Sequence, residues 1–68
     1  MDIRTMRKNA VVVPFCVTDD GVVFNTPRRE TVTIKYTRSS WFEINGQPII
    51  PNNGDYIRTS QFCFFITD

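Results

Sequence analysis

Residues 31–37 read T-V-T-I-K-Y-T and alternate strictly between two kinds of side chain. Val32, Ile34 and Tyr36 take every second position, and Thr or Lys stands between them. Successive side chains of a β-strand point to opposite faces of a sheet. The stretch therefore predicts a strand with one face against a core and the other face in water.

The composition extends this prediction to the whole chain. Its 68 residues include seven Val, seven Ile, eight Thr and nine aromatic residues, but one Ala and no Leu. β-Branched and aromatic residues fit the pleated surface of a sheet, whereas the best helix formers are nearly missing. A chain this short forms one domain and buries only about 60% of the surface that its unfolded form exposes. We expect a single all-β domain with little stability to spare.

The next stretch, residues 41–50, reads W-F-E-I-N-G-Q-P-I-I. An Asn-Gly pair between apolar segments predicts a hairpin with a type I′ turn. That turn would form four pairs across the hairpin: Ile44 with Gln47, Glu43 with Pro48, Phe42 with Ile49, and Trp41 with Ile50. The inner face would then hold Phe42, Ile44 and Ile49, and a second apolar face would hold Trp41, Pro48 and Ile50.

Residues 10–24 predict another hairpin. The side chains alternate from Ala10 to Thr18, and Asp20-Gly21 is a strong signal for a two-residue turn. In that register Val17 would lie opposite Phe24. Four side chains would then share one apolar face: Phe15, Val17, Val22 and Phe24.

The rest of the chain supplies the last strands and the N-terminal segment. Residues 56–58 predict a short strand, and residues 62–67 predict a final strand with Phe62, Phe64 and Ile66 on one face. Six or seven short strands with regular turn signals favour a small antiparallel barrel or a compact sandwich over residues 10–68. Residues 1–9 are polar and do not alternate, so we expect an arm outside this domain that becomes ordered on contact with a partner.

Nothing in the sequence predicts an enzyme, a cofactor or a metal site. The chain has no His, which is the commonest general acid or base and the commonest metal ligand. Two Cys without His do not complete a zinc site, and the spacing of a calcium-binding loop is absent. The three Gly lie in separate turns and cannot form a phosphate-binding loop. We therefore assign no catalytic, cofactor-binding or metal-binding residues.

Cys16 and Cys63 lie far apart in strand-like segments. We expect two reduced and partly buried thiols, with a disulfide between them as the alternative. No apolar run reaches the ~18 residues that cross a bilayer, and residues 1–9 do not resemble a secretory signal. These features predict a soluble protein without membrane contact, in the cytoplasm or within an assembled particle.

The apolar surplus of residues 41–50 favours a non-enzymatic interaction or assembly module. Exposed apolar patches mark contact sites, and aromatic residues and Arg are enriched in their centres. The partner would be a protein, either a second copy or a larger assembly, and the Thr- and Asn-rich β pattern has the general look of a small viral or phage structural subunit. The predicted contact residues are Trp41, Glu43, Pro48 and Ile50 of the hairpin, with Arg4 and Arg7 of the arm.

A small β-barrel that binds single-stranded nucleic acid is the alternative function. Such proteins stack bases on aromatic residues and track the backbone with a basic groove. The residues that would make these contacts are Arg28, Arg29, Lys35, Arg38, Arg58 and Tyr56. The net charge of +1 counts against this function, because nucleic-acid-binding faces are usually strongly basic. A third interpretation keeps Trp41, Pro48 and Ile50 inside a second layer of core.

Overall fold

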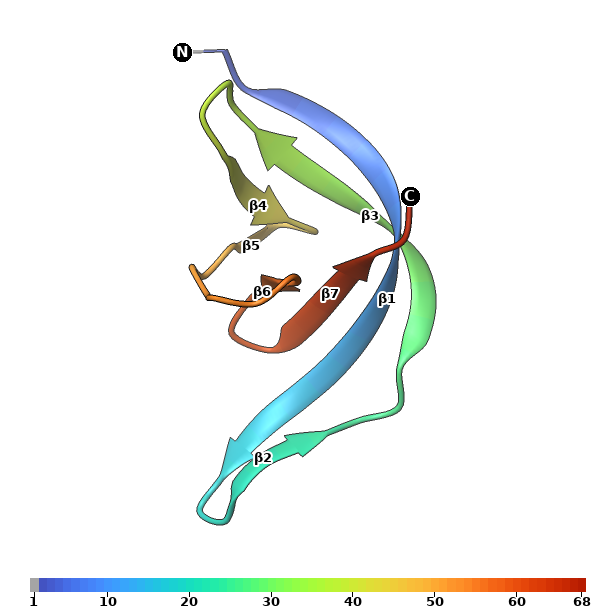
Figure 1. Cartoon of the computed structure of the whole chain (residues 1–68), viewed down its shortest axis with the longest axis vertical. Helices are drawn as coiled ribbons and strands as arrows, with labels where there is room; N and C mark the ends of the chain where they lie inside the picture. The colour runs from blue at the N-terminus through green and yellow to red at the C-terminus, as the bar shows by residue number, and fades with distance from the viewer. Residues whose placement is uncertain (1) are drawn as a thin grey trace.

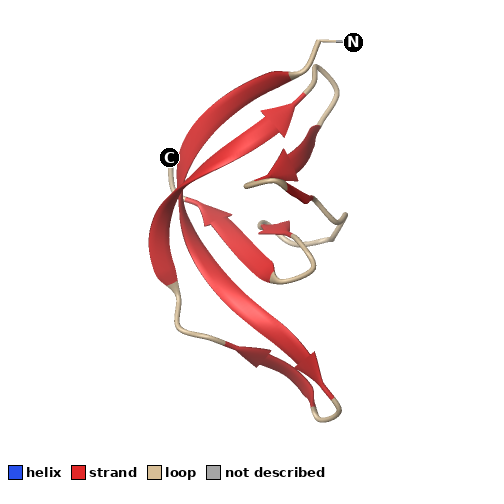
Figure 2. Ribbon diagram, turned by 180° about the vertical axis from the view of Figure 1, so that it is seen from behind, coloured by secondary structure: helices blue, strands red, loops and turns tan. Residues whose placement is uncertain are grey.

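The computed structural model describes residues 2–68, and within them it contains seven strands and no helix (Figure 2). The strands are β1 (Arg4–Thr18), β2 (Gly21–Phe24), β3 (Arg28–Tyr36), β4 (Trp41–Ile44), β5 (Gln47–Pro48), β6 (Ile57–Arg58) and β7 (Phe62–Ile66). All of the strand pairs are antiparallel. The prediction of a small all-β domain is confirmed.

The strands form one curled sheet that resembles half of a barrel. Their order across the sheet is β5-β4-β3-β1-β7-β6, and β2 pairs with the far end of β1. The long strands β1 and β3 bend together, and β4 to β7 lie within the curve of this bend (Figure 1). One bridge brings the two ends of the sheet together, because the Ile50 amide donates to the Arg58 carbonyl over 2.8 Å.

The core lies on one face of this sheet. Its buried side chains come from four strands: Ala10, Val12, Val32, Ile34, Ile44 and Phe64. Val32, Ile34 and Ile44 are completely buried, whereas Lys35 is exposed. The alternation of residues 31–37 therefore gave the correct buried face. The final strand is also as predicted, since Phe64 is buried and Phe62 and Ile66 pack against the core.

The Asn45-Gly46 turn is confirmed. Both residues have positive φ angles, 50° and 81°, as a type I′ turn requires. Ile44 lies opposite Gln47, and Glu43 lies opposite Pro48. The turn is also tied to β3, because the Thr33 amide donates to Asn45 Oδ1 over 3.0 Å.

The start of the same hairpin differs from the prediction. Trp41 lies opposite Tyr36 and Glu43 lies opposite Lys35, so Phe42 is one extra residue in β4. Such a bulge breaks the alternation of side chains along a strand. As a result Phe42 is 37% exposed and does not lie on the inner face. Its predicted pairing with Ile49 is reduced to one hydrogen bond, which the Ile49 amide donates to the Phe42 carbonyl.

The predicted pairing of Trp41 with Ile50 is wrong. The ladder between β4 and β5 ends at Pro48, and Ile50 instead pairs with Arg58 of β6. Trp41 is opposite Tyr36, and residues that oppose each other in an antiparallel pair project from the same face. Trp41 therefore belongs to the rim of the core face and does not share an outer face with Pro48 and Ile50.

Residues 4–9 are not an arm outside the domain. They form the first part of β1 and pair with β3, from Arg4 opposite Tyr36 to Asn9 opposite Thr31. The backbone ladder explains this, because it needs no apolar side chains and β3 is long enough to pair with all of these residues. Met1 lies outside the described residues.

The turn between β1 and β2 is shifted by one residue from the prediction. Thr18 lies opposite Gly21 and Val17 opposite Val22, so Asp19 and Asp20 form the turn. A type I′ turn at Asp20-Gly21 would require a positive φ at Asp20. The structure leaves that conformation to Gly21 alone, with φ 124°.

Candidate protein-contact surface

Residues 15–24, the end of β1 together with β2, project away from the rest of the sheet (Figure 1). We call this segment the projecting hairpin. It helps to give the small domain an elongated shape of 42 × 22 × 20 Å. The remaining strands do not cover it, because β7 pairs with β1 only as far as Pro14.

The projecting hairpin exposes a concentration of apolar side chains. The exposed fractions are 71% for Val17, 52% for Val22, 53% for Val23 and 61% for Phe24. Only Phe15, at the base of the hairpin, is buried. The predicted apolar face of Phe15, Val17, Val22 and Phe24 is present, because Phe15 lies opposite Phe24 and Val17 lies opposite Val22. Only Phe15 is buried, however, and the other three side chains are exposed.

Local contacts fix the shape of this hairpin. The Thr18 hydroxyl donates to the Gly21 carbonyl over 3.0 Å and accepts from the Asp20 amide over 3.3 Å. The rings of Phe15 and Phe24 lie 6.1 Å apart in a tilted arrangement, which is a favourable geometry for an aromatic pair. The hairpin is therefore a defined element and not a loose loop.

A cavity of about 190 Å³ lies where the projecting hairpin meets β6 and β7. Its lining is mostly apolar and aromatic: Phe15, Val22, Phe24, Tyr56, Arg58 and Cys63. The Arg58 guanidinium carbon is 5.5 Å from the centre of the Phe15 ring, within the range of a cation–π contact. Burial raises the pKa of the Cys63 thiol, and the charge of Arg58 opposes this shift. Cys63 is therefore a buried thiol that is protonated at neutral pH.

The cysteines differ in environment. Both are unpaired, as expected, but Cys16 is exposed on the projecting hairpin while Cys63 is buried. The expectation that both thiols are partly buried is therefore wrong for Cys16. Its strand loses the cover of β7 after Pro14, and the side chain opposite it is the exposed Val23.

Two backbone edges of the projecting hairpin are open. Within residues 2–68, β2 pairs with β1 and with no other strand. On its other side β1 loses β7 after Pro14, apart from the hydrogen bond that Phe15 donates to the Gln61 carbonyl over 3.0 Å. Open edges of this kind are templates for an added strand.

The partner-contact residues predicted from the sequence do not gather in one patch. Trp41 is 40% exposed at the rim of the core face, and Ile50 is 36% exposed beside β6. Glu43, opposite the exposed Pro48, is held by an ion pair with Lys35 over 3.4 Å. The other two predicted residues are exposed on β1, Arg4 paired with Asp2 over 3.1 Å and Arg7 further along the strand.

The predicted nucleic-acid residues lie in three different places. Arg28 is paired with Glu30 and Lys35 with Glu43, which leaves these two cations less available for phosphate. The exposed Arg38 lies between β3 and β4. The other three, Arg29, Tyr56 and Arg58, share the face opposite the core. Val11 of β1 lies opposite both Arg29 and Phe65, which places these two side chains on that face. The centre of the Tyr56 ring is 5.4 Å from the centre of the Phe65 ring. Arg58 lies on this face too, opposite Cys63.

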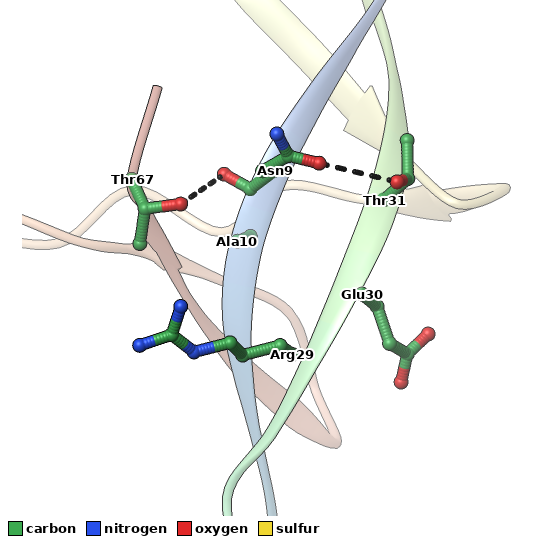
Figure 3. Close-up of a pocket in the computed structure, with 6 residues that line it drawn as sticks. All are labelled: Asn9, Ala10, Arg29, Glu30, Thr31 and Thr67. Carbon is green, nitrogen blue, oxygen red and sulfur yellow. Dashed lines mark hydrogen bonds between the residues drawn. The ribbon is translucent and has the colours of Figure 1, made fainter.

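A polar hollow of about 350 Å³ lies where β1 and β3 run side by side, near the end of β7 (Figure 3). Its residues are Asn9, Ala10, Arg29, Glu30, Thr31 and Thr67. The Thr67 hydroxyl donates to the Asn9 carbonyl over 3.1 Å, and the Thr31 hydroxyl donates to Asn9 Oδ1 over 3.2 Å. Asn9 also donates two hydrogen bonds to the Asp68 carboxylate, and these lower the Asp68 pKa. The hollow is thus explained by contacts that fasten residues 67 and 68 to β1.

No group of three Cys, Asp or Glu side chains suited to holding a metal ion occurs among residues 2–68. The described chain also has no helix that could cross a membrane. No protein-family model, curated protein or solved structure matches this chain. On the surface of the described residues, the projecting hairpin holds the most exposed large apolar side chains C-terminal to residue 3.

Proposed function

We propose that this chain is a non-enzymatic protein-interaction module that joins an assembly through its projecting hairpin. The observation that carries the proposal is the exposure of Val17, Val22, Val23 and Phe24 on one element with two open edges. Monomeric soluble proteins rarely expose contiguous apolar side chains in this way unless a partner covers them. The contact surface thus moves from the hairpin at 41–50 to residues 15–24.

The energetics of this hairpin favour a partner that also pairs with the backbone. Burying a fully exposed Val or Phe side chain contributes about 1.5–3 kcal/mol, so four half-exposed ones contribute roughly 3–6 kcal/mol. Association costs about 4–15 kcal/mol in lost translational and rotational freedom. Apolar burial alone therefore gives at most weak binding. Strand addition at an open edge supplies the hydrogen bonds that would make the contact stable.

A structural subunit of a larger complex, such as a viral or phage particle, is a setting that fits this module. In a particle many copies are held together, and repeated weak contacts add up to stable association. The high content of β-branched residues and the small size suit such a role, but the proposal itself rests on the hairpin.

Sedimentation velocity tests the proposal when the wild type is compared with three variants. The wild type should associate as its concentration rises, and Phe24→Lys should remain a monomer with native circular dichroism. Val22→Lys should behave in the same way, and the matched control Trp41→Ser should associate like the wild type. Association that survives both lysine variants but is lost in Trp41→Ser would move the contact back to residues 41–50.

A second candidate, binding of single-stranded nucleic acid, is favoured by one observation. Arg29, Arg58, Tyr56 and Phe65 share the face opposite the core, and no ion pair with a carboxylate involves either Arg within residues 2–68. Stacking rings beside cations are the elements of a single-strand site. Titration with a labelled oligonucleotide decides this case. Phosphate-driven binding should weaken steeply between about 50 and 200 mM salt, and no binding at low salt would eliminate the candidate.

A further inference from the structure

We propose that the partner of the projecting hairpin is a second copy of this chain, with the two β2 strands paired antiparallel around a two-fold axis at Val23. This inference rests on the proposed function and adds the identity of the partner and the register of the contact. The pairing of the two β2 strands joins the half-barrel sheets of the two copies. Self-pairing of this kind is isologous, because the same residues contribute from both copies.

The direction of the backbone groups in β2 is the first argument. In an antiparallel ladder, successive residues direct their N–H and C=O groups to alternate sides of the strand. Phe15 donates to Gln61 on the β7 side, so its partner Phe24 directs its own groups away from β1. The Asn25 amide, one residue later, donates back to the Pro14 carbonyl over 2.8 Å, which agrees with this alternation. Val22 and Phe24 therefore present their backbone groups to the open edge.

These two residues define a self-complementary register. If Val22 of one copy lies opposite Phe24 of the other, the two-fold axis repeats the pair and four backbone hydrogen bonds form. Val23 then faces its own counterpart. Side chains of directly opposed residues lie on the same face, so each exposed Val22 packs against the exposed Phe24 of the other copy.

The charges at the two ends of this segment are the second argument, and they indicate a copy of the same chain. Asp19-Asp20 precede β2, and Arg28-Arg29 follow it. An antiparallel two-fold pairing in this register brings Asp19 opposite Pro27 of the other copy, next to Arg28, which also pairs with Glu30 of its own chain. Within residues 2–68 neither Asp19 nor Asp20 forms an ion pair. Opposite charges at the two ends of an edge steer the copies into this orientation and disfavour a parallel one.

Disulfide cross-linking at Val23 tests this register. The test uses Val23→Cys in a Cys16→Ser background. In the proposed register, residue 23 of one copy lies opposite residue 23 of the other, with their Cα atoms about 4.5 Å apart. A disulfide requires Cα atoms within about 7 Å. The control Val17→Cys is also highly exposed, but β2 of each copy separates it from the axis. We expect Val23→Cys to form covalent dimers at least about ten-fold faster under mild oxidation, since only it meets this distance.

Charge exchange provides a second measurement that does not depend on the new thiols. Asp19→Lys should weaken dimerisation in sedimentation velocity, and adding Arg28→Asp should restore it. Equal cross-linking of Val23→Cys and Val17→Cys, or no rescue by Arg28→Asp, would overturn the β2 pairing. If Phe24→Lys still abolishes association in that case, the proposed function stands and only the partner strand is wrong. A wild type that stays monomeric up to about 1 mM would overturn the self-pairing itself.

Discussion

The guanidinium carbon of Arg58 lies 5.5 Å from the centre of the Phe15 ring. This contact fastens the base of the projecting hairpin to β6, which is the last strand of the sheet. On the hairpin itself the Phe15 ring pairs with Phe24, yet Phe15 is 9% exposed and Phe24 is 61% exposed. Two rings of one aromatic pair thus belong to different environments, one to the domain and one to solvent.

Alanine substitutions should separate these two environments. We expect Phe15→Ala to cost about 3–5 kcal/mol of unfolding free energy, because it removes a buried ring and leaves a cavity. Phe24→Ala should cost less than about 1 kcal/mol in the monomer, since its ring is mostly solvated. Urea denaturation at low protein concentration measures both. Equal costs would mean that Phe24 is part of the core.

The bulge in β4 gives a second prediction for the hairpin at 41–50. Ile44 is completely buried while Phe42 is 37% exposed, although the alternation of the sequence places both on one face. Ile44→Ala should therefore cost about 2–5 kcal/mol, and Phe42→Ala distinctly less. Thermal and urea unfolding of the two variants provide the comparison. A larger loss for Phe42→Ala would argue against the bulge and restore the regular register.

The turn between β4 and β5 gives a third prediction. A side chain at Gly46 would meet no atom within 4 Å, but its backbone has a φ of 81°. Gly46→Val should lower the free energy of unfolding by about 1–3 kcal/mol through the backbone alone. Asn53→Val, at an exposed residue with no positive φ, is the matched control and should change stability by less than about 0.5 kcal/mol. Equal losses in both variants would count against the positive φ at Gly46.

The two thiols give a fourth prediction, which corrects the expectation of equal burial. Cys16 should react with a thiol reagent within the mixing time in the dilute native protein. Cys63 should react only after denaturant is added, because it is buried and its raised pKa keeps it protonated. Its protection should hold at neutral pH and decrease as the pH rises toward that pKa. Slow labelling of Cys16 in the dilute protein would show that the hairpin is covered within the monomer.

The parts of the fold that the sequence predicted are those in which side-chain pattern and backbone conformation act together. The alternation around Val32 and Ile34 identified the buried face of β3, and Asn45-Gly46 identified a turn that needs two positive φ angles. Pattern failed for residues 4–9, which are polar and yet form a strand. There the ladder with β3 stabilises the strand through backbone hydrogen bonds, which do not depend on the pattern of side chains in the sequence.

The contact surface was harder to predict for a related reason. The apolar residues from Phe15 to Phe24 have the same pattern whether a strand covers them or not. Whether they are core depends on how far β7 reaches along β1, and that strand ends opposite Pro14. One signal was present in the sequence: the predicted final strand, residues 62–67, is too short to cover all of residues 10–18. Comparing strand lengths would have indicated the exposed end.

Nuclear magnetic resonance of the backbone amides across a concentration series is the sharpest test of the projecting hairpin as the contact surface, because it reports on each residue with a backbone amide. As the wild-type concentration rises toward about 1 mM, a weak contact becomes populated and its amide signals shift or broaden. We expect these changes to gather in residues 15–24, with the amides of Val22 and Phe24 changing most, and we expect Phe24→Lys to remove them. Changes confined to residues 41–50, or the same changes in Phe24→Lys as in the wild type, would contradict this prediction.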